Sequence, residues 1–75
     1  MNYKKYNNFE EIKSGDEVQI HSNGEWNQVF GIIENINVIN KRAEIFTIEH
    51  PECRYIVRED NLSNIEMIVE WIYKQ

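Results

Sequence analysis

The chain has 75 residues, a formal net charge of −5 and 41% hydrophobic residues. This length allows one small domain, residues 1–75, whose apolar core is limited in size. A single cysteine excludes an intramolecular disulfide, and the sequence has no Cys/His cluster of the structural-zinc type, so we expect no metal or cofactor. The apolar runs are too short to cross a bilayer and no apolar signal segment opens the chain, so we expect a cytoplasmic protein without a membrane partner.

The acidic residues are spread along the chain without a long run, which is typical of a solvated surface. Net negative charge argues against strong nucleic-acid binding, because neutralising phosphates requires a basic face. The alternative is an acidic face that contacts a basic partner or imitates nucleic acid.

Residues 1–14 are expected to cover one end of the domain. Their apolar side chains recur at intervals of three: Tyr3, Tyr6, Phe9 and Ile12. A short helix would place them on one side, and we predict a helical turn over residues 9–13, capped by Asn8 and ended by Ser14 and Gly15. We expect Phe9 and Ile12 to close the core. Whether Tyr3 and Tyr6 also pack there is left undecided, because chain termini often fray.

Period-two alternation of apolar and polar residues predicts five strands, at residues 16–21, 28–36, 43–49, 54–58 and 65–72. In the second strand the alternation slips near Glu34 and Asn35, which predicts a bulge. Gly31 lies within an apolar run, where glycine usually marks a close approach of two backbones. The third strand has apolar residues on both faces, so we expect its second face to be partly covered.

Residues 59–64 are polar except for Leu62 and predict a 3₁₀ turn before the last strand. A helix is the competing interpretation for residues 65–72, because Ile65, Ile68 and Ile72 recur at helical spacing. The expected core is Val18, Ile20, Ile33, Ile45, Val57 and Leu62.

Three runs together resemble the KOW-type and related SH3-like domains: IKSGDEVQI, GIIENI and AEIFTIE. The later run YIV, followed by Asp60, Asn61 and Leu62, also resembles the last two strands of such barrels. The resemblance covers about residues 12 to 69. It implies a small five-stranded antiparallel SH3-like barrel with a 3₁₀ turn before the last strand. Together with the short N-terminal helical turn predicted above, the expected fold class is all-β. KOW domains are usually basic and bind RNA, whereas this chain is acidic; SH3-like subunits that bind other proteins are an equally good comparison.

His50 and Cys53 flank Pro51 and Glu52 in one predicted loop. A thiolate–imidazole pair can act as a nucleophile or bind a metal. Two ligands make a poor metal site, and a catalytic site needs a fuller constellation of groups. We therefore expect no catalytic residues, and no enzyme.

Aromatic residues are the better candidates for a binding surface, because they bury much area with little loss of entropy. Trp26 follows Glu25 in the polar loop 22–28, where it either folds onto the core or contacts a partner. The predicted partner-binding residues are Trp26, Glu25, Phe30, Phe46 and Tyr55, the last three expected close together on neighbouring strands. Trp71 and Tyr73 could form an edge for self-association into a homo-oligomer.

The sequence thus predicts a non-enzymatic protein-interaction module that docks on a larger protein. The alternative is a nucleic-acid-related role, as a KOW-like RNA- or DNA-binding domain or as an acidic inhibitor that imitates nucleic acid. The first of these would use a local cluster of cations: Lys41, Arg42, Arg54 and Arg58.

Overall fold

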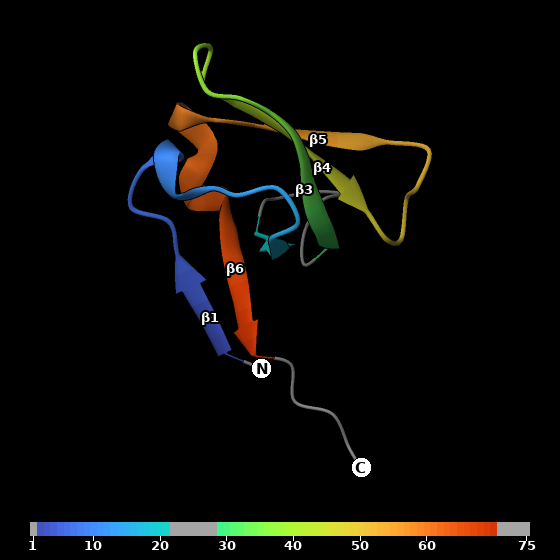
Figure 1. The fold of residues 1–75 in the computed structure, drawn as a ribbon. Helices are drawn as coiled ribbons and strands as arrows, with labels where there is room; N and C mark the ends of the chain where they lie inside the picture. The colour runs from blue at the N-terminus through green and yellow to red at the C-terminus, as the bar shows by residue number, and fades with distance from the viewer. Residues whose placement is uncertain (1, 22–28, 71–75) are drawn as a thin grey trace.

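The computed structural model describes residues 2–21 and 29–70, which form one antiparallel β-sheet with short 3₁₀ segments (Figure 1). In chain order the elements are β1 (Asn2–Lys5), η1 (Phe9–Glu11), β2 (Glu17–Ile20), β3 (Val29–Asn37), β4 (Arg42–Thr47), β5 (Arg54–Arg58), η3 (Glu59–Asn64) and β6 (Ile65–Glu70). The strand order in the sheet is β1-β6-β2-β3-β4-β5. The predicted all-β class is therefore confirmed.

The sheet of the described residues has six strands, and the prediction of five is wrong. The additional strand is β1, which lies in the expected cover segment 1–14 and pairs with β6. The turn predicted over residues 9–13 is present as the 3₁₀ segment η1. The polar ends of β1 fit β6, since the Asn2 amide donates to the Glu70 carboxylate at 2.6 Å and Lys5 lies 3.5 Å from that of Glu66. β1 and β5 each pair with a single described strand, so the sheet is open and not the closed barrel that was expected.

The predicted strand positions agree with the structure to within about two residues wherever they can be compared. β5 has the predicted bounds, and η3 forms the predicted 3₁₀ turn before the last strand. β6 begins at Ile65 as a strand, so the helical alternative is wrong over residues 65–70. Residues 28, 71 and 72 lie outside the described part of the chain.

All six predicted core residues are buried: Val18, Ile20, Ile33, Ile45, Val57 and Leu62. Phe9 and Ile12 close the core as expected. Tyr6 is also buried, at 8% exposure, and its hydroxyl donates to Asp16 Oδ2 at 2.8 Å. Burial, and to a lesser extent the hydrogen bond and charge of Asp16, raise the pKa of Tyr6 well above its usual range. Residues 6–12 are thereby fixed across one end of the sheet.

Two backbone features of β3 were predicted and are present. A Cβ at Gly31 would lie 2.7 Å from the carbonyl oxygen of Phe46 and would overlap the Ile45 side chain, so β3 and β4 can approach only with glycine here. The β3–β4 register shifts between Glu34 and Asn37, and Asn35 has a φ of 55° in the left-handed region. This is the predicted bulge.

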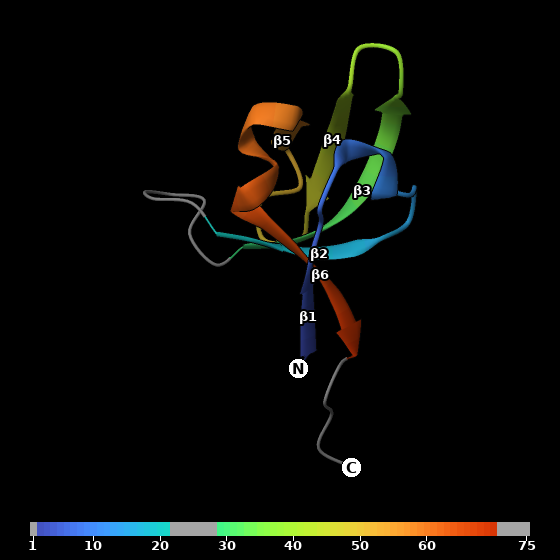
Figure 2. The same ribbon diagram turned by 90° about the vertical axis from the view of Figure 1, so that its left-hand side faces the viewer.

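The β3–β4 hairpin extends beyond the rest of the sheet (Figure 2). Its turn is closed by the Lys41 N–H, which donates to the Val38 carbonyl at 3.3 Å, and by the Asn40 N–H, which donates to Asn37 Oδ1 at 3.0 Å. Lys41 has a φ of 51°, and Ile39 at the tip is 92% exposed.

Candidate functional site

The faces of β3, β4 and β5 opposite the core carry a group of apolar side chains that we call the outer strip. Because strand residues alternate between faces, burial of Ile33, Ile45 and Val57 places their neighbours on the other side of the sheet. The outer strip consists of Phe30, Ile32, Phe46, Ile48 and Ile56. Its members are partly exposed, and Ile48, just after β4, is 57% exposed.

Strand register brings the outer strip together. Ile32 lies opposite Phe46 in the β3–β4 pair, and the Ile48 N–H donates to the Phe30 carbonyl at 3.0 Å. Ile56 lies opposite Glu44 in the β4–β5 pair, on the same face. Side chains directly opposite in an antiparallel pair are close enough to pack. The strip therefore runs across three strands.

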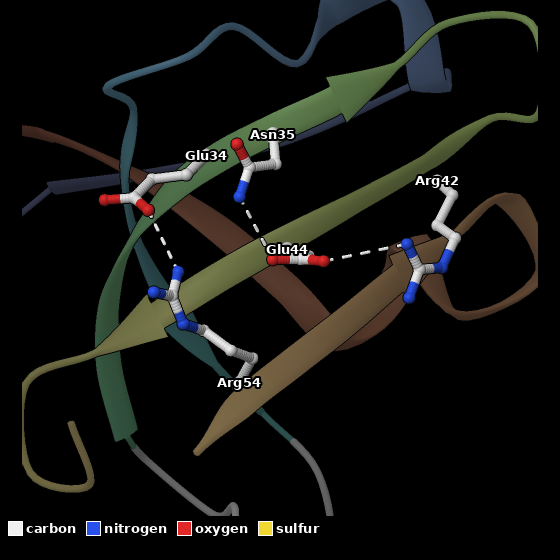
Figure 3. Close-up of polar contacts among 5 residues, drawn as sticks. All are labelled: Glu34, Asn35, Arg42, Glu44 and Arg54. Carbon is white, nitrogen blue, oxygen red and sulfur yellow. Dashed lines mark hydrogen bonds and ion pairs between the residues drawn. The ribbon is translucent and has the colours of Figure 1, made fainter. Parts of the chain in front are cut away.

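Arg54 contacts both Phe46 of the outer strip and the carboxylate of Glu34; Figure 3 shows the second of these contacts. From β5 the arginine side chain crosses β4, and its Nη1 lies 2.9 Å from Oε1 of Glu34 on β3. Its guanidinium carbon lies 4.9 Å from the centre of the Phe46 ring, which is a cation–π geometry. One arginine thus covers an aromatic ring and ties β5 to β3.

Glu44 is the centre of a second polar group on the same face (Figure 3). Its Oε1 accepts a hydrogen bond of 3.1 Å from Asn35 Nδ2, and its Oε2 lies 3.7 Å from Arg42 Nη1. Asn35 lies in the β3 bulge with a left-handed φ of 55°, and its side-chain amide is directed toward this carboxylate.

The charges of this face balance. Three acids and three bases of β2–β5 point to it, so their formal sum is zero: Glu17, Glu34, Glu44, Arg42, Arg54 and Arg58. The whole chain carries −5. The charged residues of these strands thus balance, whereas those of the whole chain do not.

The predicted partner-binding residues separate in the structure. Phe30 and Phe46 both lie in the outer strip, but Tyr55 does not share their surface, and that expectation is wrong. Tyr55 lies opposite Ile45 and packs against the buried core, where its hydroxyl accepts a 3.3 Å hydrogen bond from Asn64. Glu25 and Trp26 lie outside the described residues, as do Trp71 and Tyr73.

Three of the four predicted nucleic-acid contacts are paired with carboxylates. Lys41 lies 3.0 Å from Glu59 and 3.5 Å from Glu10, and the Glu59 hydrogen bond, followed by the charges of both acids, raises the pKa of Lys41. Arg42 and Arg54 pair with Glu44 and Glu34, as described above. Arg58 lies opposite Arg42 in the strand register. Three of the four cations are therefore paired with acids, and only Arg42 and Arg58 adjoin each other across strands, so the four do not form a uniform basic surface.

His50 and Cys53 belong to one tight turn after β4. The Cys53 N–H donates to the His50 carbonyl at 2.9 Å, and Thr47 Oγ1 donates to the same oxygen at 2.7 Å. These contacts give the segment a structural role in reversing the chain. Cys53 is an exposed free cysteine. Within residues 2–21 and 29–70, no three His, Cys, Asp or Glu side chains gather as a metal site would require.

The described residues contain no helix of the length and apolarity needed to span a membrane. Comparison of the chain with protein-family models, with curated proteins and with solved structures finds no match.

Proposed function

We propose that the chain is a non-enzymatic protein-interaction module and that the outer strip is its contact surface. The observation that carries this proposal is a row of partly exposed apolar side chains, including Phe30 and Phe46, on the face opposite the core. Aromatic and aliphatic anchors within a polar rim are the usual anatomy of a protein interface. The Arg54 contacts to Glu34 and Phe46 hold part of this surface in place before a partner arrives.

We also propose that residues 12–69 have an SH3-like fold to which β1 has been added. In support, the strands that correspond to the five predicted ones are consecutive in the sheet, in the order β6-β2-β3-β4-β5. The 3₁₀ segment η3 lies between the last two of them in the chain. A rigid sheet of this kind supports recognition on one face, although fold likeness by itself does not choose a function.

The partner best suited to this face is a larger protein whose contact surface has an apolar patch and a net charge near zero. A face whose own charges sum to zero gains little from a strongly basic or acidic partner. The nucleic-acid alternative has less support, because Lys41, Arg42 and Arg54 are each within 4.0 Å of a carboxylate. Phosphate binding would have to break those pairs.

Affinity capture from the source cells, quantified by mass spectrometry with and without nuclease, tests the proposal. The baits are the native chain, Phe46→Ala in the outer strip, and Ile39→Ser as the matched control. Ile39 is an exposed aliphatic residue in the turn that joins β3 to β4, outside the outer strip. We expect the Phe46→Ala bait to recover roughly tenfold less of the captured protein, or less still, than the native bait does. Ile39→Ser and nuclease treatment should leave the recovered amount unchanged.

Two results would contradict the proposal. Equal recovery with both variants would show that the outer strip does not carry the contact. Loss of the captured protein after nuclease treatment would favour the nucleic-acid alternative. Thermal melting of each bait establishes that it is folded before capture is compared.

A further inference from the structure

Among the described strands β5 forms one edge of the sheet, and part of its outer backbone is hydrogen-bonded to a side chain. Successive strand residues direct their N–H and C=O groups to opposite sides of the strand. Asn61, in the η3 segment that follows, contacts the backbone of Ile56 and Arg58. The even-numbered residues of β5 therefore direct their backbone groups toward the open edge, while Tyr55 and Val57 direct theirs toward β4.

The Asn61 amide presents the hydrogen-bonding groups of a neighbouring strand. Its Nδ2 donates to the Ile56 carbonyl at 3.0 Å, and its Oδ1 accepts from the Arg58 N–H at 2.7 Å. One residue of a parallel strand opposite Val57 would donate and accept at these same two backbone groups. The side chain thus occupies the position at which an added strand would pair.

The local fold holds Asn61 in this position. η3 follows β5 directly, and Leu62 anchors it by inserting into the core. Asn61 has φ −116° and ψ 18°, which interrupts the helical geometry of η3. Because the residue is three positions after Arg58, its side chain can reach back to the start of η3 and to the strand together.

We propose that Asn61 blocks strand addition by a second copy of this chain at the Ile56–Arg58 end of the β5 edge. An unprotected edge strand is a template for pairing with another chain. Tyr55, Ile56 and Val57 are consecutive residues of high β propensity, which makes this edge a favourable one to extend. The inference is independent of the proposed function, because it concerns the edge of the sheet and not the outer strip.

Sedimentation velocity over a concentration series tests the inference with three variants of the full chain. Asn61→Ala removes both hydrogen bonds, whereas Asn61→Asp keeps the acceptor for Arg58 and loses the donor to Ile56. Asn64→Ala is the matched control, because it removes a side-chain hydrogen bond from the same segment, to the Tyr55 hydroxyl, and not one to the β5 backbone. Hydrogen exchange at the Arg58 amide reports on the edge directly.

We expect Asn61→Ala to melt about 5 °C lower than the native chain, to exchange the Arg58 amide on the order of tenfold faster and to self-associate as its concentration rises. Asn61→Asp should retain Arg58 protection and self-associate to a smaller extent, and it decides the question if Asn61→Ala does not fold. The inference is overturned if the folded Asn61 variants sediment like the native chain at every concentration. It is also overturned if Asn64→Ala self-associates equally, because lost stability would then be the cause.

Discussion

The Arg54 guanidinium lies over the ring of Phe46, the residue opposite it on the neighbouring strand, at 4.9 Å from the ring centre. The same guanidinium pairs with Glu34 at 2.9 Å, so a single side chain spans β5, β4 and β3. The Phe46 ring is thus partly covered by a guanidinium whose position is set by the ion pair with Glu34. This relationship also predicts how the outer strip responds to substitution.

Arg54→Ala should lower the free energy of unfolding by only about 1 kcal/mol, because both members of the ion pair are well exposed and solvent screens their attraction. Urea denaturation measures this change, with Arg54→Lys as the conservative comparison that keeps the charge but loses the planar stacking. A loss of several kcal/mol would mean that Arg54 supports the core as well as the face.

Gly31→Ala should destabilise the chain by about 1–3 kcal/mol, because the new methyl group would press on the Phe46 carbonyl and the Ile45 side chain. Gly15→Ala is the control. A Cβ there meets open space, and only the positive φ of 93° disfavours it, so a cost of about 1 kcal/mol is expected. Chemical denaturation measures the free energy of unfolding of both variants. A smaller loss for Gly31→Ala than for Gly15→Ala would contradict the close β3–β4 packing.

Tyr6→Phe should lower stability near neutral pH by roughly 1–2 kcal/mol, because Asp16 loses the hydrogen bond from the buried hydroxyl. The folded state raises the pKa of Tyr6 above its ordinary value of 10.0. The contribution of the hydroxyl is therefore complete below pH 10 and declines as the pH rises above that value, since the unfolded chain then releases the proton more readily. Unfolding measured across alkaline pH should show the native chain losing its advantage over Tyr6→Phe, and a constant difference would refute this assignment.

Period-two patterns predicted β5, the start of β6 and the six core residues, because burial of one sheet face requires apolar residues at every second position of a strand. β1 was missed for the opposite reason. Its residues, NYKK, are all exposed, and Tyr3 happened to continue the three-residue spacing of the buried Tyr6 and Phe9. Pairing with β6 depends on the tertiary structure, which local spacing does not encode.

The candidate site could be predicted only in part. Apolar residues on both faces of the third predicted strand pointed to Phe46, and alternation placed it opposite to the core. The error at Tyr55 arose because neighbouring aromatic residues share a surface only when their strand register also agrees, and Tyr55 pairs with buried Ile45. The contacts of Arg54 and Glu44 depend on that register and on the β3 bulge, so sequence spacing could not reveal them.

The most direct measurement is the affinity of the purified captured partner for two variants, Ile56→Ser in the outer strip and Ile39→Ser at the hairpin tip. Both remove the same aliphatic side chain, but only the first lies on the proposed contact surface. Titration by calorimetry should show Ile56→Ser binding roughly tenfold or more weakly than the native chain and Ile39→Ser binding as the native chain does. Unchanged affinity for a folded Ile56→Ser would contradict the assignment of the outer strip as the binding face.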